Sequence, residues 1–305
     1  MFLRKLILLT LVLSIATVAG CGGKKGKKKL STNEKYEQAM KLTDPEAKAK
    51  KLADVGEEQA SAGDIMAAEK SFDEAIKAAA QIETVDGKVS AYTIIAAEAI
   101  KAEMNSQARK AVDKAGDAVS GMEDPQAQTL QFAKLAVSYS KLGEDRKPKI
   151  YLTKAKNQIE TLDTDSAQIN CLVAVGYAYH QIEDASGADE LLGQAIAKSN
   201  GLTDTRAKCD GLAAVASKRI SMDQDDKAVA ILKDALTVAR SIDDGGDETL
   251  ISKVYALAAI GKQFRRAGEK DQASEIFEEA SALAKKIKDS DARMDANGTI
   301  SSSKK

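Results

Sequence analysis

The sequence predicts an all-α fold: a right-handed solenoid of six helical hairpins with a half-unit at each end. Residues that can cap a helix N-terminus recur along the 305-residue chain at a step of 40, with one step of 45: Asp44, Thr84, Asp124, Thr164, Asp204, Thr249 and Asp289. Hydrophobic residues make up 44% of the chain but aromatic residues only 4%, which suits close packing of helices rich in Ala, Leu, Ile and Val. The sustained period-two alternation that indicates a strand is missing from the sequence.

The first 20 residues predict a secretory signal peptide. Arg4 and Lys5 precede an apolar run, residues 6–19, that is short for a membrane-spanning helix and ends in small residues. Residues 18–21, with the sequence VAGC, resemble the lipobox of bacterial lipoproteins. The resemblance implies cleavage before Cys21, lipidation at that cysteine and anchoring to the lipid bilayer by acyl chains. The alternative is an ordinary secretory signal followed by an incidental cysteine.

Residues 21–30 predict a lipidated cysteine followed by a flexible basic tether. Five lysines between Lys24 and Lys29 lie among glycines, a composition that buries no apolar surface. The lysines would either contact anionic lipid headgroups or act as a solvated spacer. We therefore expect a lipid-anchored protein of the bacterial cell envelope. Gly22, rather than Asp, after the cysteine favours the periplasmic face of the outer membrane.

The charge of the remaining body argues against nucleic acid as a partner. Without the seven cationic residues of segment 1–29, the chain has 38 Lys and Arg against 46 Asp and Glu, a net charge of −8. Binding to phosphates needs a basic face, and no basic stripe with interleaved aromatic residues is present in the sequence.

Residues 31–43 predict an N-terminal capping helix. Ser31 and Glu34 have the spacing of a capping box. Ala39 and Leu42 correspond to Ala79 and residue 82 one repeat later, so this helix looks like the second half of a hairpin. Such a half-unit would cover the open end of the solenoid.

Six full units follow, at residues 44–83, 84–123, 124–163, 164–203, 204–248 and 249–288. Their opening Asp or Thr residues can accept hydrogen bonds from amides of the first turn, and Pro45 and Pro125 occupy the next position, where proline is tolerated. Each first helix has a large apolar residue followed four positions later by a small one: Leu52 and Gly56, Tyr92 and Ala96, Phe132 and Ala136, Leu172 and Gly176, Leu212 and Ala216, Leu257 and Gly261. Large residues facing small ones predict closely packed pairs of helices.

These units resemble the tetratricopeptide repeat. Its order of apolar, small, aromatic, Gly, Ala, large apolar and Ala residues is present as Ile260, Gly261, Phe264, Gly268, Ala273, Phe277 and Ala280. The resemblance covers residues 44–288 and implies a binding function. Departures from the family are the period of 40 instead of 34, the absence of the usual Trp, and Pro148 at an Ala position. We expect Pro148 in the first turn of a helix that starts late.

Two segments interrupt or end the repeats. Segment 243–248 holds five additional residues and predicts a loop or hinge; it lacks the ligand spacing of an EF-hand, which disfavours a Ca²⁺ site. Segment 289–305 predicts a short capping helix that ends at Asn297 and Gly298, followed by a disordered tail.

The few reactive side chains do not predict an enzyme. Cys171 and His180 are nine residues apart on one predicted helix, about 13 Å along its axis, too far for a Cys–His nucleophile. Cys171 and Cys209 lie on equivalent helices of adjacent units, where two buried thiols are favoured over a disulfide. We expect no catalytic residue, no metal and no cofactor.

The expected site is therefore a surface. In tetratricopeptide arrays the first helices line a concave groove, and the resemblance assigns the following side chains to it: Ile100, Leu130, Val137, Asn170, Tyr177, His180, Ile220, Tyr255, Lys262 and Arg265. Apolar residues on a face that should meet water favour a partner-binding strip. The alternative is packing between neighbouring first helices, and for His180 a structural or merely exposed role.

We thus predict a membrane-anchored protein-interaction scaffold of the envelope that binds a peptide or protein segment in its concave groove. The alternative is a solute- or glycan-binding lipoprotein, which would need a closed pocket with convergent polar groups and aromatic residues.

Overall fold

The computed structural model describes residues 30–304, which form fourteen α-helices and a single 3₁₀ turn, Val119–Gly121; this part of the chain contains no strand. The predicted signal peptide, Cys21 and the lysines from Lys24 to Lys29 lie outside these residues. Within the described range, no helix is both long and apolar enough to span a membrane.

The helices alternate as the repeat predicts. The first helices of the units are α2 (Pro45–Ser61), α4 (Val85–Lys101), α6 (Pro125–Lys141), α8 (Asp165–Gln181), α10 (Thr205–Ile220) and α12 (Asp247–Arg266). The second helices are α3 (Ile65–Ala80), α5 (Asn105–Ala118), α7 (Arg146–Ile159), α9 (Ala185–Gly201), α11 (Asp225–Arg240) and α13 (Lys270–Ala284). The ends are α1 (Thr32–Met40) and α14 (Ser290–Ser303).

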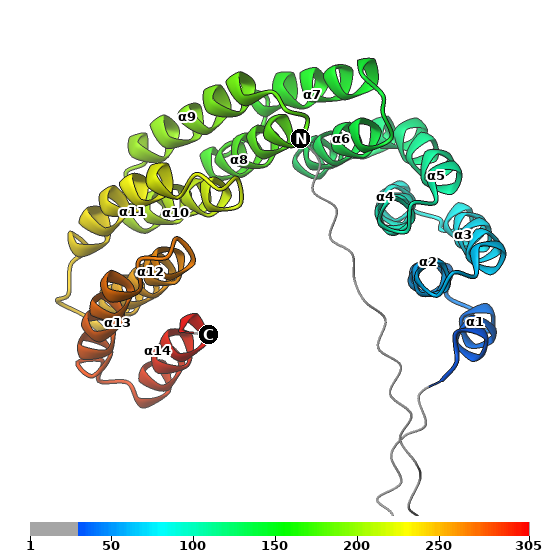
Figure 1. The fold of residues 1–305 in the computed structure, drawn as a ribbon. Coiled ribbons are helices and arrows are strands. Elements are labelled where there is room, and N and C mark those ends of the chain that lie inside the picture. The colour runs from blue at the N-terminus through cyan, green and yellow to red at the C-terminus, as the bar shows by residue number, and fades with distance from the viewer. Residues whose placement is uncertain (1–29, 305) are drawn as a thin grey trace, which may run out of the picture.

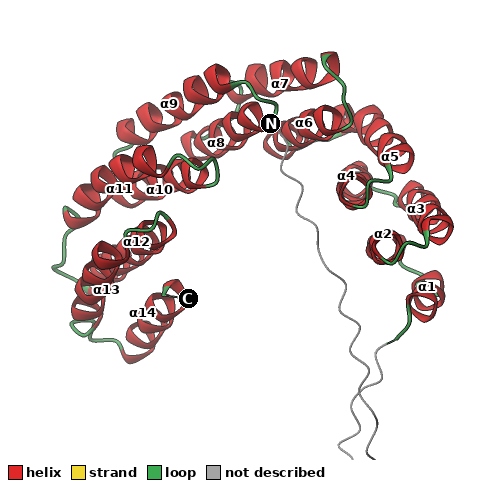
Figure 2. Cartoon of the chain, viewed as in Figure 1, coloured by secondary structure: helices red, strands yellow, loops and turns green. Residues whose placement is uncertain are grey.

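These helices stack as hairpins in an arc, which confirms the predicted all-α solenoid. Each first helix packs against its own second helix and against the first helix of the next unit. Figure 1 shows the result: α2, α4, α6, α8, α10 and α12 form the inner row, and the second helices form the outer row. The connections between helices are short, as Figure 2 shows. The concave side of the molecule therefore belongs to the first helices.

The predicted caps form at five of the six unit starts and at Asp289. Each of these side chains accepts a hydrogen bond from an amide of the first turn: Asp44 from Ala47 at 2.9 Å, Thr84 from Gly87 at 3.2 Å, Asp124 from Gln126 at 2.8 Å, Thr164 from Ala167 at 3.1 Å, Asp204 from Ala207 at 3.2 Å and Asp289 from Ala292 at 2.7 Å. Ser31 and Glu34 form the expected capping box of α1. The forty-residue mark is thus a chemical start signal.

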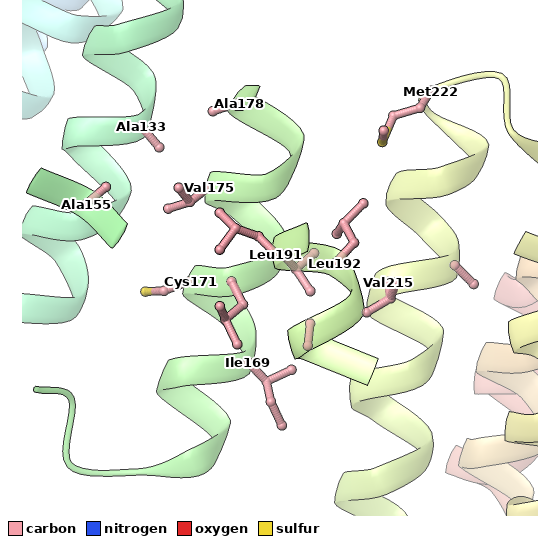
Figure 3. Packing of buried hydrophobic residues seen from close by; sticks show 14 of the residues in the cluster. Ala133, Ala155, Ile169, Cys171, Val175, Ala178, Leu191, Leu192, Val215 and Met222 are labelled. Carbon is pink, nitrogen blue, oxygen red and sulfur yellow. The ribbon is translucent and has the colours of Figure 1, made fainter. Parts of the chain in front are cut away.

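Large residues of the second helices fill the space that small residues of the first helices leave. A Cβ atom added at Gly56 would lie 3.0 Å from the buried Phe72 ring, and one added at Gly261 would lie 3.0 Å from Phe277. In the fourth unit, a Cβ atom added at Gly176 of α8 would lie 3.1 Å from Leu192 and 3.3 Å from Leu191. Figure 3 shows these two leucines of α9 in the packed layer between α8 and α10. The core is consequently a continuous layer between the two rows.

The structure confirms the prediction that Pro148 lies in the first turn of a helix. It is the third residue of α7 and is buried there. Proline is tolerated in the first turn because the amides of that turn have no partner within the helix.

Two expectations about the ends of elements are wrong. Thr249 does not cap its helix, because α12 begins earlier, at Asp247, with Gly246 as N-cap. The carboxylate of Asp247 accepts hydrogen bonds from the amides of Lys288 and Asp289, at 3.0 and 2.9 Å. The additional residues after Ile242 therefore form a loop and also extend α12 at its N-terminus, to Asp247.

The C-terminal helix also differs from its prediction. It continues through Asn297 and Gly298 to Ser303, and the expected disordered tail is helical up to that residue. Ile300 is buried, and the side-chain amide of Asn297 donates to the carbonyl of Arg293 at 2.9 Å. Burial of Ile300 against the last unit outweighs the weak helix propensity of Asn and Gly.

At the N-terminal end, Ala39 is fully buried like its equivalent Ala79, whereas Leu42 is 38% exposed and its equivalent Ile82 is buried. Helix α1 ends at Met40 and α3 at Ala80, so Leu42 and Ile82 both lie two positions beyond their helix.

Candidate functional site

The concave face is hollowed at the middle of the inner row. A groove of about 420 Å³ lies there, open to solvent and lined by residues of α4, α6, α8 and α10. Its lining consists of Thr93, Ala97, Leu130, Ala133, Lys134, Val137, Ser138, Lys141, Ala174, Tyr177, Ala178, Gln181 and Lys218. We call this set the central groove. Its lining comes from the first helices of four successive units.

The floor of the central groove is apolar. Leu130, Val137 and Tyr177 are half-buried, and each packs against the hydrophobic core from the concave side. Leu130, Ala133 and Val137 fall at helical spacing on α6, so they form one stripe along that helix. These side chains therefore do both things that the sequence left open: they pack against the core and they present an apolar surface to the groove.

Tyr177 is held from two sides. The ammonium of Lys218, from α10, lies 4.6 Å from the centre of the Tyr177 ring, a cation–π distance. The His180 ring lies 6.2 Å from it on the same helix, with an angle of 28° between the ring planes. The phenol is thus positioned beside the groove by contacts with its own helix and with the next unit.

Three lysines surround the apolar floor. Lys134 and Lys141 come from α6 and Lys218 from α10, and the lining of the groove contains no Asp or Glu. These ammonium groups give the centre of the concave face a positive character, although the body has a net charge of −8.

The other predicted groove residues lie outside this hollow. Ile100 and Ile220 are half-buried and pack against the core, and Asn170 is exposed. Tyr255 receives the guanidinium of Arg206 at 5.9 Å from its ring centre. Of the ten residues assigned to the groove by resemblance, the central groove brings together Leu130, Val137 and Tyr177.

The last two residues assigned to the groove, Lys262 and Arg265, lie near the C-terminal end of α12. Arg265 donates a hydrogen bond to the carbonyl of Lys304 in the C-terminal turn. Neighbouring Arg266 donates to the hydroxyl of Ser217 at 2.8 Å and to the side chain of Gln263 at 2.8 Å. Lys262 is exposed.

The residues that sequence reasoning missed are mainly the polar ones, Thr93, Lys134, Lys141, Gln181 and Lys218. Two of them, Lys141 and Gln181, are the last residues of α6 and α8. Thr93 and Lys134 lie in the middle of α4 and α6, and Lys218 lies in the last turn of α10. The family pattern assigns three positions of each first helix to the groove, and none of these five residues falls at one of them.

The cysteines are structural in their placement. Both are buried and free, and their S–H groups point at backbone carbonyls, Cys171 at Gln126 (3.9 Å) and Cys209 at Ala235 (3.7 Å). Burial raises the pKa of each thiol to about 11, so both stay protonated and poorly nucleophilic near neutral pH. Across residues 30–304, no cluster of three or more His, Cys, Asp or Glu side chains is arranged to hold a metal ion.

Comparison with known proteins gives helical-repeat neighbours of low similarity. No family model matches the sequence, and no curated protein matches it. A Podosopora anserina putative kinesin light chain with nearly identical TPR-like repeats is 15% identical; the match covers 68% of this chain and 100% of that one, with a TM-score of 0.38.

Two further solved structures match over most of this chain. BtubC from P. vanneervenii is 13% identical, with 84% of this chain and 91% of that chain covered and a TM-score of 0.40. A Rap protein, solved in complex with competence and sporulation factor, is 12% identical, with 90% and 79% covered and a TM-score of 0.38. Because these identities and TM-scores are low, the description of the fold rests on the helices and contacts of this chain itself.

Proposed function

We propose that this chain is a protein-interaction scaffold that binds a peptide or protein segment in the central groove. One observation carries the proposal: half-buried apolar side chains gather in a hollow on the face of the solenoid that should meet water. Exposed apolar surface is costly to maintain and commonly marks a docking site. A groove of about 420 Å³ holds a few side chains of a bound segment.

The proposed mechanism is docking on a preformed surface. Leu130, Val137 and Tyr177 are backed by the core, so binding orders few of the chain's own side chains. An apolar side chain of the partner would enter between α6 and α8 and displace water from Val137 and Tyr177. We propose binding rather than turnover as the role, because Cys171 and Cys209 are buried and protonated and His180 packs beside Tyr177.

Site-specific crosslinking in cells tests this function. A photoreactive amino acid at position 177 is expected to capture one or a few proteins, because Tyr177 lines the groove. The same amino acid at position 149, an exposed site on outer helix α7, serves as the matched control. Capture should be lost when Val137→Asp is added, which places a charge on the apolar floor.

Three results would argue against peptide or protein binding. Equal capture from positions 177 and 149 would show that the groove is not special. Capture from position 177 that survives Val137→Asp would place the contact elsewhere. Saturable labelling by cell-wall fragments instead of protein would favour the solute- or glycan-binding alternative.

We also propose that the chain is lipid-anchored at Cys21 in the bacterial cell envelope, on the periplasmic face of the outer membrane. The support is the sequence alone: the basic start, the apolar run, and VAGC before a basic tether. In this arrangement the Lys24–Lys29 segment separates the bilayer from the scaffold and adds attraction to anionic headgroups.

Replacing Cys21 tests the anchor. Incorporation of a clickable palmitate analogue into the chain, and its recovery with the membranes, should both be abolished by Cys21→Ser. Cys171→Ser and Cys209→Ser are the controls, since both thiols are buried and should leave labelling unchanged. Labelling that persists in the Cys21→Ser variant would exclude this site, and recovery with inner-membrane vesicles would contradict the outer-membrane assignment.

A further inference from the structure

The lysines around the central groove lack partners of opposite charge. Within residues 30–304, none of Lys134, Lys141 and Lys218 forms an ion pair. The groove lining itself supplies no carboxylate. In an acidic body, this is a local excess of positive charge beside an apolar floor.

The repeat contains its own comparison for one of these lysines. Lys101 stands forty residues before Lys141, at the same place in the preceding unit. Its ammonium lies 3.1 Å from a carboxylate oxygen of Glu57 and 3.8 Å from one of Glu98. The residue forty positions after Glu57 is Ala97, which lines the groove.

The same geometry thus neutralises Lys101 within the chain and leaves Lys141 free. At the first pair of units the concave face carries the carboxylate of Glu57, and at the next pair it carries only the methyl group of Ala97. Lys141 therefore has no carboxylate at position 97 to pair with, and position 97 lines the central groove.

Building on the proposed function, we infer that the segment bound in the central groove is acidic, with Asp or Glu side chains beside its apolar ones. Its apolar side chains lie on Leu130, Val137 and Tyr177, and its carboxylates meet Lys134, Lys141 and Lys218. Lys218 is the best placed of the three, because its stacking on Tyr177 at 4.6 Å holds the ammonium at the edge of the apolar floor. Such complementarity selects the partner more than it strengthens binding.

Three sets of immobilised peptides test the inference. All peptides are acetylated and amidated, so that chain ends carry no charge, and all share the same Leu and Ala positions. The remaining positions are Glu in the first set, Gln in the second and Lys in the third. We expect the purified full-length chain to bind the Glu set about tenfold more tightly than the Gln set at low salt, and the preference to shrink as NaCl screens the charges.

The decisive variant restores the missing carboxylate. Ala97→Glu should pair with Lys141 as Glu57 pairs with Lys101, and should reduce the preference for the Glu set to about threefold or less. Ala97→Gln adds a side chain of the same size without the charge, so binding lost through bulk alone appears in both variants. The Glu-over-Gln preference should be lower for Ala97→Glu than for Ala97→Gln. Ala97 is exposed, so both variants should keep the helical circular dichroism of the parent.

The outcomes separate this inference from the proposed function. Equal binding of the Glu and Gln sets, both lost on Val137→Asp, would overturn the acidic partner and leave the scaffold standing. A Glu preference unchanged by Ala97→Glu would place the acidic contact away from Lys141 and overturn the site. Binding of anionic lipid vesicles or duplex DNA through these lysines, without a preference for Glu peptides, would also overturn it. No binding of any set, together with no capture from position 177, would contradict the proposed function itself.

Discussion

Gly211 sets how closely the helices of neighbouring units approach. A Cβ atom added there would lie 3.0 Å from the Cβ of Ser199 and closer still to its hydroxyl. Ser199 belongs to α9, is fully buried, and donates to the carbonyl of Ala195 at 2.7 Å, so it has little room to move.

Gly211→Ala should therefore lower the midpoint of thermal unfolding. Overpacking costs about 1–3 kcal/mol, against about 0.5–1 kcal/mol that alanine adds to helix stability, so the net effect is destabilising. The control is Gly193→Ala in α9, where an added Cβ meets nothing within 4 Å; this change should raise the midpoint, by about 0.5–1 kcal/mol of stability. Equal stabilisation by both substitutions would mean that α9 and α10 can separate without cost.

Individual residues of the groove were predictable only when the repeat placed them there. Leu130, Val137 and Tyr177 were assigned to the concave face from the family pattern, and the structure brings them together. Lys218 was not, because its importance depends on the ring of Tyr177 one unit earlier. The role of a charged side chain depends on whether it has a partner, and that partner can be about forty residues away in the sequence.

At the scale of elements, helix starts were more predictable than helix ends. Asp and Thr caps act within three residues, and most of them form as the sequence indicates. Helix ends depend on what the next turn can bury. Helix α14 continues beyond Gly298 because this extension buries Ile300.

The hairpin turns show the same dependence on context. Gly63, Gly143 and Gly268 turn three of the hairpins with φ of 83°, 77° and 88°. The other three hairpins place Glu103, Glu183 and Asp223 in this left-handed region, where non-glycine residues are uncommon. A search for glycine alone would find half of the turns, whereas the step of 40, with its one step of 45, finds all six.

At the scale of the whole molecule, contacts join neighbours along the stack. Helix α14 packs on α12 and α13, and the central groove is built by α4, α6, α8 and α10. Figure 1 shows the end of the chain at the far end of the arc from α1. In such an array, stability is approximately a sum over units and the interfaces between them.

Damage at the C-terminal cap should consequently stay local. Ile300→Asp buries a charge at a position that is 3% exposed. We expect α14 to lose its amide hydrogen-exchange protection and α12 and α13, which it contacts, to lose less. Protection in α6 and α8 should stay unchanged. Ser301→Asp puts the same charge on the exposed face of the same helix and should leave all protection as it was. Peptide binding in the central groove should survive both changes, because no residue of α14 lines it. Loss of protection in α6 and α8 in step with α14 would instead show that the six hairpins unfold as one cooperative unit, and the groove would then depend on a cap that it does not touch.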